Sequence, residues 1–233
     1  MDTLPPFPGF RPEAFQFLRD LKANNERDWF KPRKQTFDDE CLWPLRCLVE
    51  DAGRAATTVG IPLRGDATKS VFRIYRDTRF SKNKDPYKTH LGAVLSRSGS
   101  RKASGGLYIH VEPDNCFTVA GFWQPDKDLL AAIRDDIVAE PDRFRGMMNA
   151  LGGLELMEYG GMLKRLPRGY QTDDEDIGEA IRHKSFIVTQ SFQEEELMAP
   201  EFTGRLIEAA GSMRSILDWG WHIQDRLNGG PQG

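Results

Sequence analysis

The sequence predicts an α+β fold with a mostly antiparallel central sheet flanked by N-terminal and C-terminal helices. Apolar residues recur at helical spacing near both ends of the chain. The middle holds β-branched and aromatic runs bounded by Gly, Pro, Asp and Asn. No repeat, long linker or charged tail divides the chain, so we expect a single domain, 1–233.

The N-terminal part is expected to be helical. Pro12 suits the first position of a helix, and Asn24-Asn25 ends it. A longer helical stretch follows over about 26–59, where aromatic and aliphatic residues keep a near-helical period. Pro32 and Pro44 should break or kink this second stretch, because proline cannot donate the helical backbone hydrogen bond.

Strands are expected in the middle, with helices after them. The predicted strands are Val71–Tyr75, Leu91–Ser96, Gly106–Glu112, Cys116–Trp123 and Lys184–Phe192. Pro113-Asp114-Asn115 is a turn that joins two of them as a hairpin. The predicted helices are Asp126–Val138, with Asp126 as its cap, Glu140–Leu151 and about Pro200–Leu227; Leu163–Tyr170 reads as a loop or short strand.

Positive charge is concentrated in one stretch of an acidic chain. Residues 64–102 contain 11 Lys and Arg against 3 Asp and Glu, whereas the whole chain carries a formal charge of −3. Within this stretch we name Arg73–His90 the basic segment. Cations recur there every two to four residues, with tyrosines between them. This pattern is typical of a surface that holds an anion, most plausibly a phosphate.

Each predicted anion-binding residue of the basic segment has a side chain that can donate a hydrogen bond to an anion, and most of these side chains are cationic. They are Arg73, Arg76, Arg79, Lys82, Lys84, Tyr87, Lys88 and His90. Arginine offers a planar fork and lysine a mobile point charge, so a loop can direct several of them at one dianion. The alternative is a solvated loop whose charges pair with acidic stretches such as Asp173–Asp176 and Glu194–Glu196.

Arg79 carries a more specific expectation. The apolar Phe80 follows it in an otherwise polar loop and should be buried. A buried Phe80 would hold Arg79 in a concave site, where its fork can grip an anion.

His110 and Glu112 are the candidates for catalysis. Their spacing on one predicted strand places both on the same sheet face as Tyr108, opposite Leu107, Ile109 and Val111. Because histidine titrates near neutrality, the two could form a proton-transfer pair beside the basic segment. Solvent exposure of a polar sheet face is the alternative. A metal site would need a third ligand, so no metal is expected.

Arg168 is the candidate in a second basic cluster, 164–170. Proline and glycine on either side of it suggest a shaped turn that directs its side chain, with an ordinary surface turn as the alternative. The sequence names no cofactor, since phosphate-loop, dinucleotide-binding and hydrolase-elbow motifs are absent.

Composition restricts the class of protein. No stretch approaches the roughly 18 apolar residues of a membrane span, and no membrane partner is expected. The N-terminus does not read as a secretory signal, and the odd number of cysteines has no metal-site spacing, so we expect a cytoplasmic protein. The negative overall charge argues against a general nucleic-acid coat but leaves room for a local basic face.

The chain resembles an uncharacterised bacterial and fungal family known as domain of unknown function 2461. The similarity covers about Phe7 to Leu227. It rests on Phe7–Phe10, Asn25–Phe30, Tyr108–Pro113, Leu166–Tyr170 and above all the long basic motif Arg76–His90. The resemblance implies one domain of this size and carries no reaction with it.

Three functional hypotheses remain open from the sequence. The leading one is a protein that binds a phosphorylated or otherwise anionic small molecule, either as a hydrolase or transferase or without chemistry. The second is a nucleic-acid-binding module, in which Tyr75, Tyr87 and Tyr108 stack on bases between phosphate contacts. The third is an interaction protein whose basic segment pairs with an acidic surface.

Overall fold

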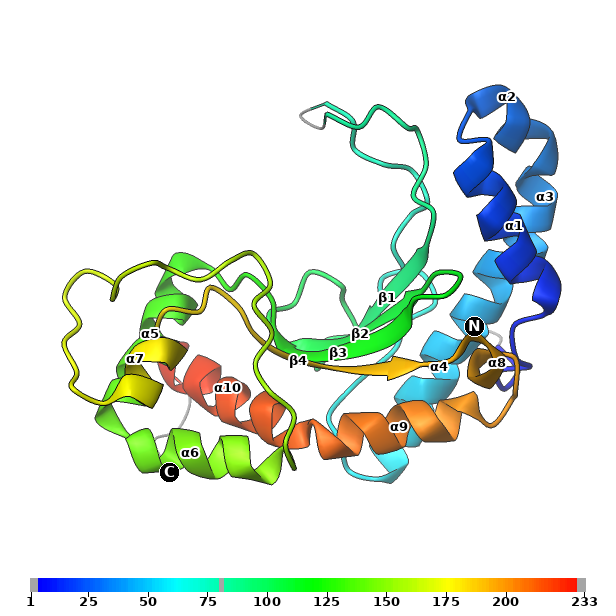
Figure 1. The fold of residues 1–233 in the computed structure, drawn as a ribbon. Coiled ribbons are helices and arrows are strands. Elements are labelled where there is room, and N and C mark those ends of the chain that lie inside the picture. The colour runs from blue at the N-terminus through cyan, green and yellow to red at the C-terminus, as the bar shows by residue number, and fades with distance from the viewer. Residues whose placement is uncertain (1–3, 80–81, 230–233) are drawn as a thin grey trace. The chain divides into compact units, whose positions relative to one another are not determined.

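The structure is a computed structural model that describes residues 4–79 and 82–229. The chain forms helices and a four-stranded sheet in the order β1-β2-β3-β4 (Figure 1), which confirms the predicted α+β fold. The strands are β1 (Leu91–Leu95), β2 (Gly106–Val111), β3 (Cys116–Phe122) and β4 (Phe186–Phe192). β1 and β2 are antiparallel, with Leu91 opposite Val111.

The chain divides into two compact units. Among the described residues, the first unit comprises 4–79, 82–103, 107–118 and 190–209, and the second comprises 104–106, 119–189 and 210–229. The single domain expected from the sequence stays a prediction. Most residues of the candidate sites, Arg168 excepted, belong to the first unit.

The helices of the first unit confirm the predicted helical N-terminal part. Pro32 falls in a 3-10 turn and Pro44 in the first turn of a helix, where no backbone donor is needed. The chain therefore stays helical past both prolines instead of breaking. The elements are α1 (Pro12–Ala23), α2 (Arg27–Phe30), the 3-10 turn Lys31–Arg33, α3 (Lys34–Thr36), the π-helical stretch Phe37–Leu42 and α4 (Trp43–Thr58).

Aromatic rings hold α1 against the elements that follow it. Phe17 of α1 contacts the rings of Trp29, Phe30 and Phe37, at centroid distances of 5.5, 6.1 and 5.9 Å. Large buried rings of this kind dominate core energetics, so these contacts stabilise the position of the turn between α1 and α2. Beneath these helices, β2 buries Leu107, Ile109 and Val111, as the alternation predicted.

The predicted strand Val71–Tyr75 is wrong. Only isolated bridges form there: Val71 pairs with Ala93 of β1, and Tyr75 pairs with Tyr87. The segment changes partners after Phe72, whose N–H donates to the Gly92 carbonyl. Because its two ends pair with different neighbours, the segment cannot complete a regular ladder with either.

The second unit has its own helices, and Asp126 caps the first of them as predicted, accepting from the N–H groups of Asp128 and Leu129. The elements of this unit are α5 (Lys127–Ala139), α6 (Pro141–Ala150), α7 (Glu175–Ala180) and α10 (Arg214–Leu227). The predicted helix 200–227 is interrupted at Met213, which separates α9 (Phe202–Ser212) from α10. Two short helices were not predicted, α7 and α8 (Glu194–Leu197), while 163–170 is irregular.

Across the described residues, every helix is too short or too polar to span a lipid bilayer.

Candidate anion-binding site

The basic segment is attached to the N-terminal helices at Tyr87. Asn25, in the turn between α1 and α2, accepts from the Tyr87 N–H at 3.1 Å and donates to its carbonyl at 3.0 Å. The Tyr87 ring stacks on Phe30 at 4.2 Å. One amide side chain thus satisfies both backbone groups of Tyr87, as a neighbouring strand would. In Figure 1 the teal chain between α4 and β1 rises beside α1 and α2.

Backbone pairs then fold the basic segment into a short ribbon. The Arg76 N–H donates to the Pro86 carbonyl at 2.9 Å, and the Lys88 N–H donates to the Ile74 carbonyl at 2.8 Å. Tyr75 lies opposite Tyr87, with ring centroids 5.5 Å apart. The ribbon therefore presents its cations from a hydrogen-bonded frame.

A cavity of about 460 Å³ lies between this ribbon and the helices α2 and α3. We call it the basic groove. Five cations line it, and no carboxylate does among its described lining residues. Three are partly engaged: Lys34 pairs with Asp38, Lys84 donates to the Thr78 carbonyl, and Arg76 Nε donates to the Tyr87 carbonyl at 3.4 Å. The lining is Arg27, Phe30, Lys31, Lys34, Tyr75, Arg76, Thr78, Lys84, Pro86 and Tyr87.

A second pocket of about 270 Å³ adjoins the basic groove and shares Phe30, Lys34 and Tyr75 with it. Asp38 is the acid among its described lining residues. The polar part of its lining is Lys34, Asp38, Arg46, Thr68, Arg73 and Arg101. Cations therefore continue from one pocket into the next, past Tyr75.

Lys88 lies where several cations converge. Burial lowers the pKa of its ammonium group, and the charges of Arg73, Arg101 and Arg76 lower that pKa further. Lys88 Nζ lies 5.1 Å from the centre of the Phe72 ring, and the Arg101 guanidinium carbon lies 6.0 Å from it. Because each of these charges opposes a proton on Lys88, a bound anion would relieve their repulsion.

His110 and Glu112 form a hydrogen-bonded relay with Tyr108, all on one face of β2 and the residue after it. Tyr108 Oη lies 2.8 Å from His110 Nδ1, and His110 Nε2 lies 3.3 Å from Glu112 Oε2. An ionised carboxylate only accepts, so Nε2 carries the proton and Nδ1 accepts from the tyrosine. Both ring nitrogens of His110 are therefore engaged, one by Tyr108 and the other by Glu112.

Glu112 is held in its ionised form. Burial raises its pKa, but hydrogen bonds from Asn115, His110 and Thr89 outweigh burial and hold that pKa below the usual carboxylate range. Thr89 Oγ1 donates to Glu112 Oε1 at 3.2 Å, and Asn115 Nδ2 donates to Oε2 at 3.2 Å. An ionised, fixed Glu112 in turn fixes the orientation of the His110 ring.

His90 joins this relay to the basic segment. Its ring stacks on His110 at 4.4 Å, and His110 stacks on Phe117 at 4.4 Å. Burial, His110 and Lys88 lower the pKa of His90 to about 4. His90 is therefore neutral near pH 7. Its ring contacts His110, and the charge of Lys88 opposes its protonation. We name His90, Tyr108, His110 and Glu112 the histidine cluster.

Gly92 leaves the space that the relay occupies. It lies opposite His110 in the β1–β2 register. A Cβ at Gly92 would come within 3.0 Å of Tyr108 Oη and 3.1 Å of the tyrosine ring. The absence of a side chain on β1 therefore lets the Tyr108 hydroxyl reach its histidine.

The structure brings together eight of the predicted residues in two groups within the first unit. Arg76, Lys84 and Tyr87 line the basic groove, and Arg73 lines the second pocket. His90, His110 and Glu112 belong to the histidine cluster, and the charge of Lys88 acts on His90. Whether any of them binds an anion, and whether His110 and Glu112 catalyse, stays a prediction.

Three predicted residues lie elsewhere. Arg79 has a 76% exposed side chain that pairs with Asp77 at 2.7 Å and holds the pKa of that carboxyl at about 2, so its expected concave position is wrong. Lys82 is exposed on the same loop. Arg168 is exposed in the second unit. Phe80, the expected anchor of Arg79, lies outside the described residues.

Three carboxylates of the acidic stretches considered as partners of the basic segment pair with other arginines. Asp174 pairs with Arg145, Glu194 with Arg19, and Glu196 with Arg205. These carboxylates are therefore occupied elsewhere in their own units, which weakens the hypothesis of an internal pairing.

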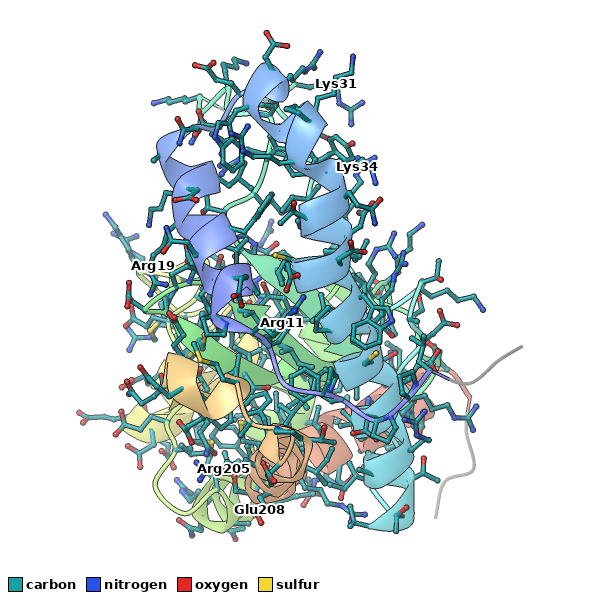
Figure 2. All side chains as sticks on the ribbon, turned by 90° about the vertical axis from the view of Figure 1, so that its right-hand side faces the viewer. Arg11, Arg19, Lys31, Lys34, Arg205 and Glu208 are labelled. Atoms are coloured by element: carbon teal, nitrogen blue, oxygen red, sulfur yellow. The ribbon has the colours of Figure 1, made fainter. Side chains whose placement is uncertain are left out.

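Sequence reasoning missed the helical half of the basic groove. The sequence predicts Arg27, Lys31 and Lys34 as part of a helical stretch and Asn25 as a helix end, without a role in binding. Their signal is the spacing of the three cations at i, i+4 and i+7, which puts them on one helical face. Figure 2 shows Lys31 and Lys34 at the end of the helices farthest from Arg11.

In the part of the chain that the structure describes, no three His, Cys, Asp or Glu side chains are placed to hold a metal ion.

Comparison with known proteins agrees with the resemblance drawn from the motifs. The model of one family, described as "Conserved hypothetical protein (DUF2461)", matches residues 13–219. No curated protein and no solved structure matches the chain. The match spans α1 to α10 and includes the basic segment, the basic groove and the histidine cluster. The chain therefore belongs to the DUF2461 family.

Proposed function

We propose that this protein binds a phosphate-bearing anion in the basic groove. The observation that carries the proposal is the lining of that groove. Arg27, Lys31, Lys34, Arg76 and Lys84 surround one cavity of about 460 Å³, with no carboxylate among its described lining residues. Like charges gathered in a hollow repel one another, and an anion converts that repulsion into attraction.

The groove has the size and the donors for such a ligand. Small-molecule sites are typically about 300–1,000 Å³, a range that includes this cavity. Arg76 is half-buried, and its Nε donates to the Tyr87 carbonyl, which fixes the direction of its remaining donors. A fixed guanidinium can offer two parallel N–H groups to a phosphate, which a lysine cannot.

Calorimetric titration with pyrophosphate tests the proposal. At low salt the parent protein should bind, and Arg76→Ala should weaken binding at least about tenfold. Arg76→Lys should bind nearly as weakly as Arg76→Ala, because lysine keeps the charge and loses the fork. Arg165→Ala, an exposed arginine of the second unit, is the matched control. A parent protein that does not bind pyrophosphate at low salt contradicts the proposal.

A hydrolase or transferase version of this function is favoured by the histidine cluster. The relay Tyr108–His110–Glu112 can accept a proton at the tyrosine hydroxyl and pass it to a histidine held by an ionised carboxylate. Cations in the neighbourhood of His90 would hold the anionic group of a substrate there. In this version Tyr108 contacts the substrate. His110 takes the proton of the Tyr108 hydroxyl, and Glu112 holds His110 in position.

Hydrolysis of p-nitrophenyl phosphate tests the catalytic version. Tyr108→Phe and Glu112→Gln should each lower the turnover by about a hundredfold or more if proton transfer limits the rate. Pyrophosphate binding should survive both substitutions. Unchanged turnover in both variants, or no turnover in the parent, contradicts the catalytic version and leaves binding intact.

We also propose a cytoplasmic location. Its support is that Cys41, Cys47 and Cys116 are all free and buried. Burial raises the pKa of the Cys116 thiol to about 11, so this thiol stays protonated near neutral pH. Fractionation of cells that express the protein, with antibody detection, tests the location.

A further inference from the structure

The basic groove and the second pocket differ from a simple phosphate site in one respect: an aromatic ring stands between them. Tyr75 lines both pockets and is 50% exposed. Behind it, Tyr87 is 4% exposed and Phe30 is 2% exposed. The ring centroids of Tyr75 and Tyr87 are 5.5 Å apart, and those of Tyr87 and Phe30 are 4.2 Å apart.

Tyr75 is therefore a held ring with an open side. Its backbone pairs with that of Tyr87, and Asn25 pins Tyr87 in turn. A solvent-facing tyrosine with a buried stack behind it loses little freedom when a second ring is placed on it. Such a platform suits a flat, unpaired base, because every base has a π-face.

Positive charge lies on both sides of this platform. Arg27, Lys31, Arg76 and Lys84 lie on the groove side, and Arg46, Arg73 and Arg101 lie on the side of the second pocket, with Lys34 shared. Asp38, the acid among the described residues of either lining, is paired with Lys34. One small anion can neutralise only one of these sets, whereas a chain with repeated phosphates can reach both.

We propose that the ligand of these two pockets is a single strand of nucleic acid. Its phosphates follow the cations of both pockets, and one base stacks on Tyr75. This inference rests on the proposed function, since it assigns a class to the same anion. A duplex does not fit the pattern, because its bases are already stacked and offer no free face to a tyrosine.

Fluorescence anisotropy tests the inference with a labelled oligothymidylate of about 12 nucleotides, a length in the range of single-strand site sizes. The oligonucleotide should bind at least about tenfold more tightly than thymidine 5′-monophosphate or pyrophosphate. Its affinity should fall with a log–log salt slope of about −0.7 for each phosphate engaged. Arg73→Ala and Arg27→Ala, one from each pocket, should each reduce that slope by about 0.7.

Substitution of the platform gives the sharper readout. Tyr75→Ala should weaken oligonucleotide binding about tenfold or more, and Tyr75→Phe should bind like the parent, because stacking needs the ring and not the hydroxyl. Tyr159→Ala is the matched control, since Tyr159 is 53% exposed in the second unit. Melting curves of all variants confirm that they are folded.

The outcomes separate this inference from the proposed function. If pyrophosphate binds and the oligonucleotide binds no tighter than the monophosphate, the inference fails and anion binding stands. If Tyr75→Ala binds the oligonucleotide like the parent, or a duplex of the same length binds as tightly, the single-strand assignment is wrong. If none of the three probes binds at low salt, both fail.

Discussion

The histidine cluster and the basic groove lie in the same unit but differ in how their polar groups are satisfied. In the cluster, Glu112 accepts from three neighbours and both nitrogens of His110 are engaged. In the groove, five cations face one cavity without a carboxylate among the described lining residues. The polar groups of the cluster therefore satisfy one another, whereas the groove would gain stability from the anion that we propose for it.

The basic groove, and not the histidine cluster, therefore has the charge arrangement that indicates a ligand. Polar residues that satisfy one another contribute to the fold whether or not a substrate binds. Like charges held together by a frame are retained at a cost to stability, and such arrangements concentrate at functional sites.

Breaking the frame should have the largest effect. Asn25→Ala removes the side chain that pairs with both backbone groups of Tyr87. The Tyr87 N–H loses its partner, and the Tyr87 carbonyl keeps only the long bond from Arg76 Nε at 3.4 Å, so we expect a loss of about 2–4 kcal/mol in the free energy of unfolding and a loss of pyrophosphate binding. Urea unfolding and calorimetry measure these two quantities.

Asn24→Ala is the control for this variant, because the Asn24 side chain donates to the Asp20 carbonyl within its own helix end. An Asn25→Ala protein that is as stable as the parent and binds pyrophosphate equally well would show that the ribbon holds its shape without this anchor.

Protonation should break the histidine cluster next. Burial, His110 and Lys88 lower the pKa of His90 from 6.5 to about 4 in the folded protein. Above pH 6.5 the ring is neutral in both states. As the pH falls from 6.5 towards 4, the unfolded chain takes up a proton that the folded chain refuses, so stability is lost across this window.

We expect His90 to contribute about 2 kcal/mol of this loss, less than the full shift implies, because the half-buried ring is partly screened. His90→Phe keeps a ring against His110 and removes the titration. Its free energy of unfolding should therefore fall less than that of the parent between pH 7 and pH 4. Identical pH profiles for parent and variant would contradict this assignment. The matched control is His222→Phe, because His222 is exposed, and its pH profile should follow that of the parent.

Crowding the relay should have a smaller effect. Gly92→Ala places a Cβ about 3.0 Å from Tyr108 Oη, so the tyrosine must move by a few tenths of an ångström from His110. We expect a loss of about 1 kcal/mol in the free energy of unfolding and no change in pyrophosphate binding. Gly146→Ala, in a helix with open space around it, should instead stabilise by up to about 1 kcal/mol. A Gly92→Ala protein more stable than the parent would mean that Tyr108 does not need this space.

The histidine cluster and the basic groove also differ in how far the sequence could predict them. Alternation along β2 placed His110, Glu112 and Tyr108 on one face correctly, because the side-chain period of a strand is fixed. The helices were found from their apolar spacing, and Asp126 from its capping chemistry. These features depend on residues close together in the chain.

The groove depended on contacts between distant residues and was only half predicted. The basic segment was recognised by its charge, but Asn25 and Tyr87 are 62 positions apart, and nothing local indicates that they pair. The strand predicted at Val71–Tyr75 failed for the same reason, since its pairing changes from β1 to the residues around Tyr87. Local propensity cannot register a change of partner.

The loop outside both clusters should give the smallest effect, and Arg79 tests it. Its guanidinium pairs with Asp77 through hydrogen bonds of 3.0 Å from Nε and 2.7 Å from Nη2, and its side chain is 76% exposed. A solvated pair within one loop presents little net charge to a ligand elsewhere. We therefore expect Arg79→Ala to leave pyrophosphate affinity within about twofold of the parent, while Arg76→Ala in the ribbon weakens it at least about tenfold. Calorimetry on the two variants side by side decides the matter. If Arg79→Ala proves as damaging as Arg76→Ala, the ligand must reach the loop, and the anion site must extend beyond the cavity that the ribbon and α2–α3 enclose.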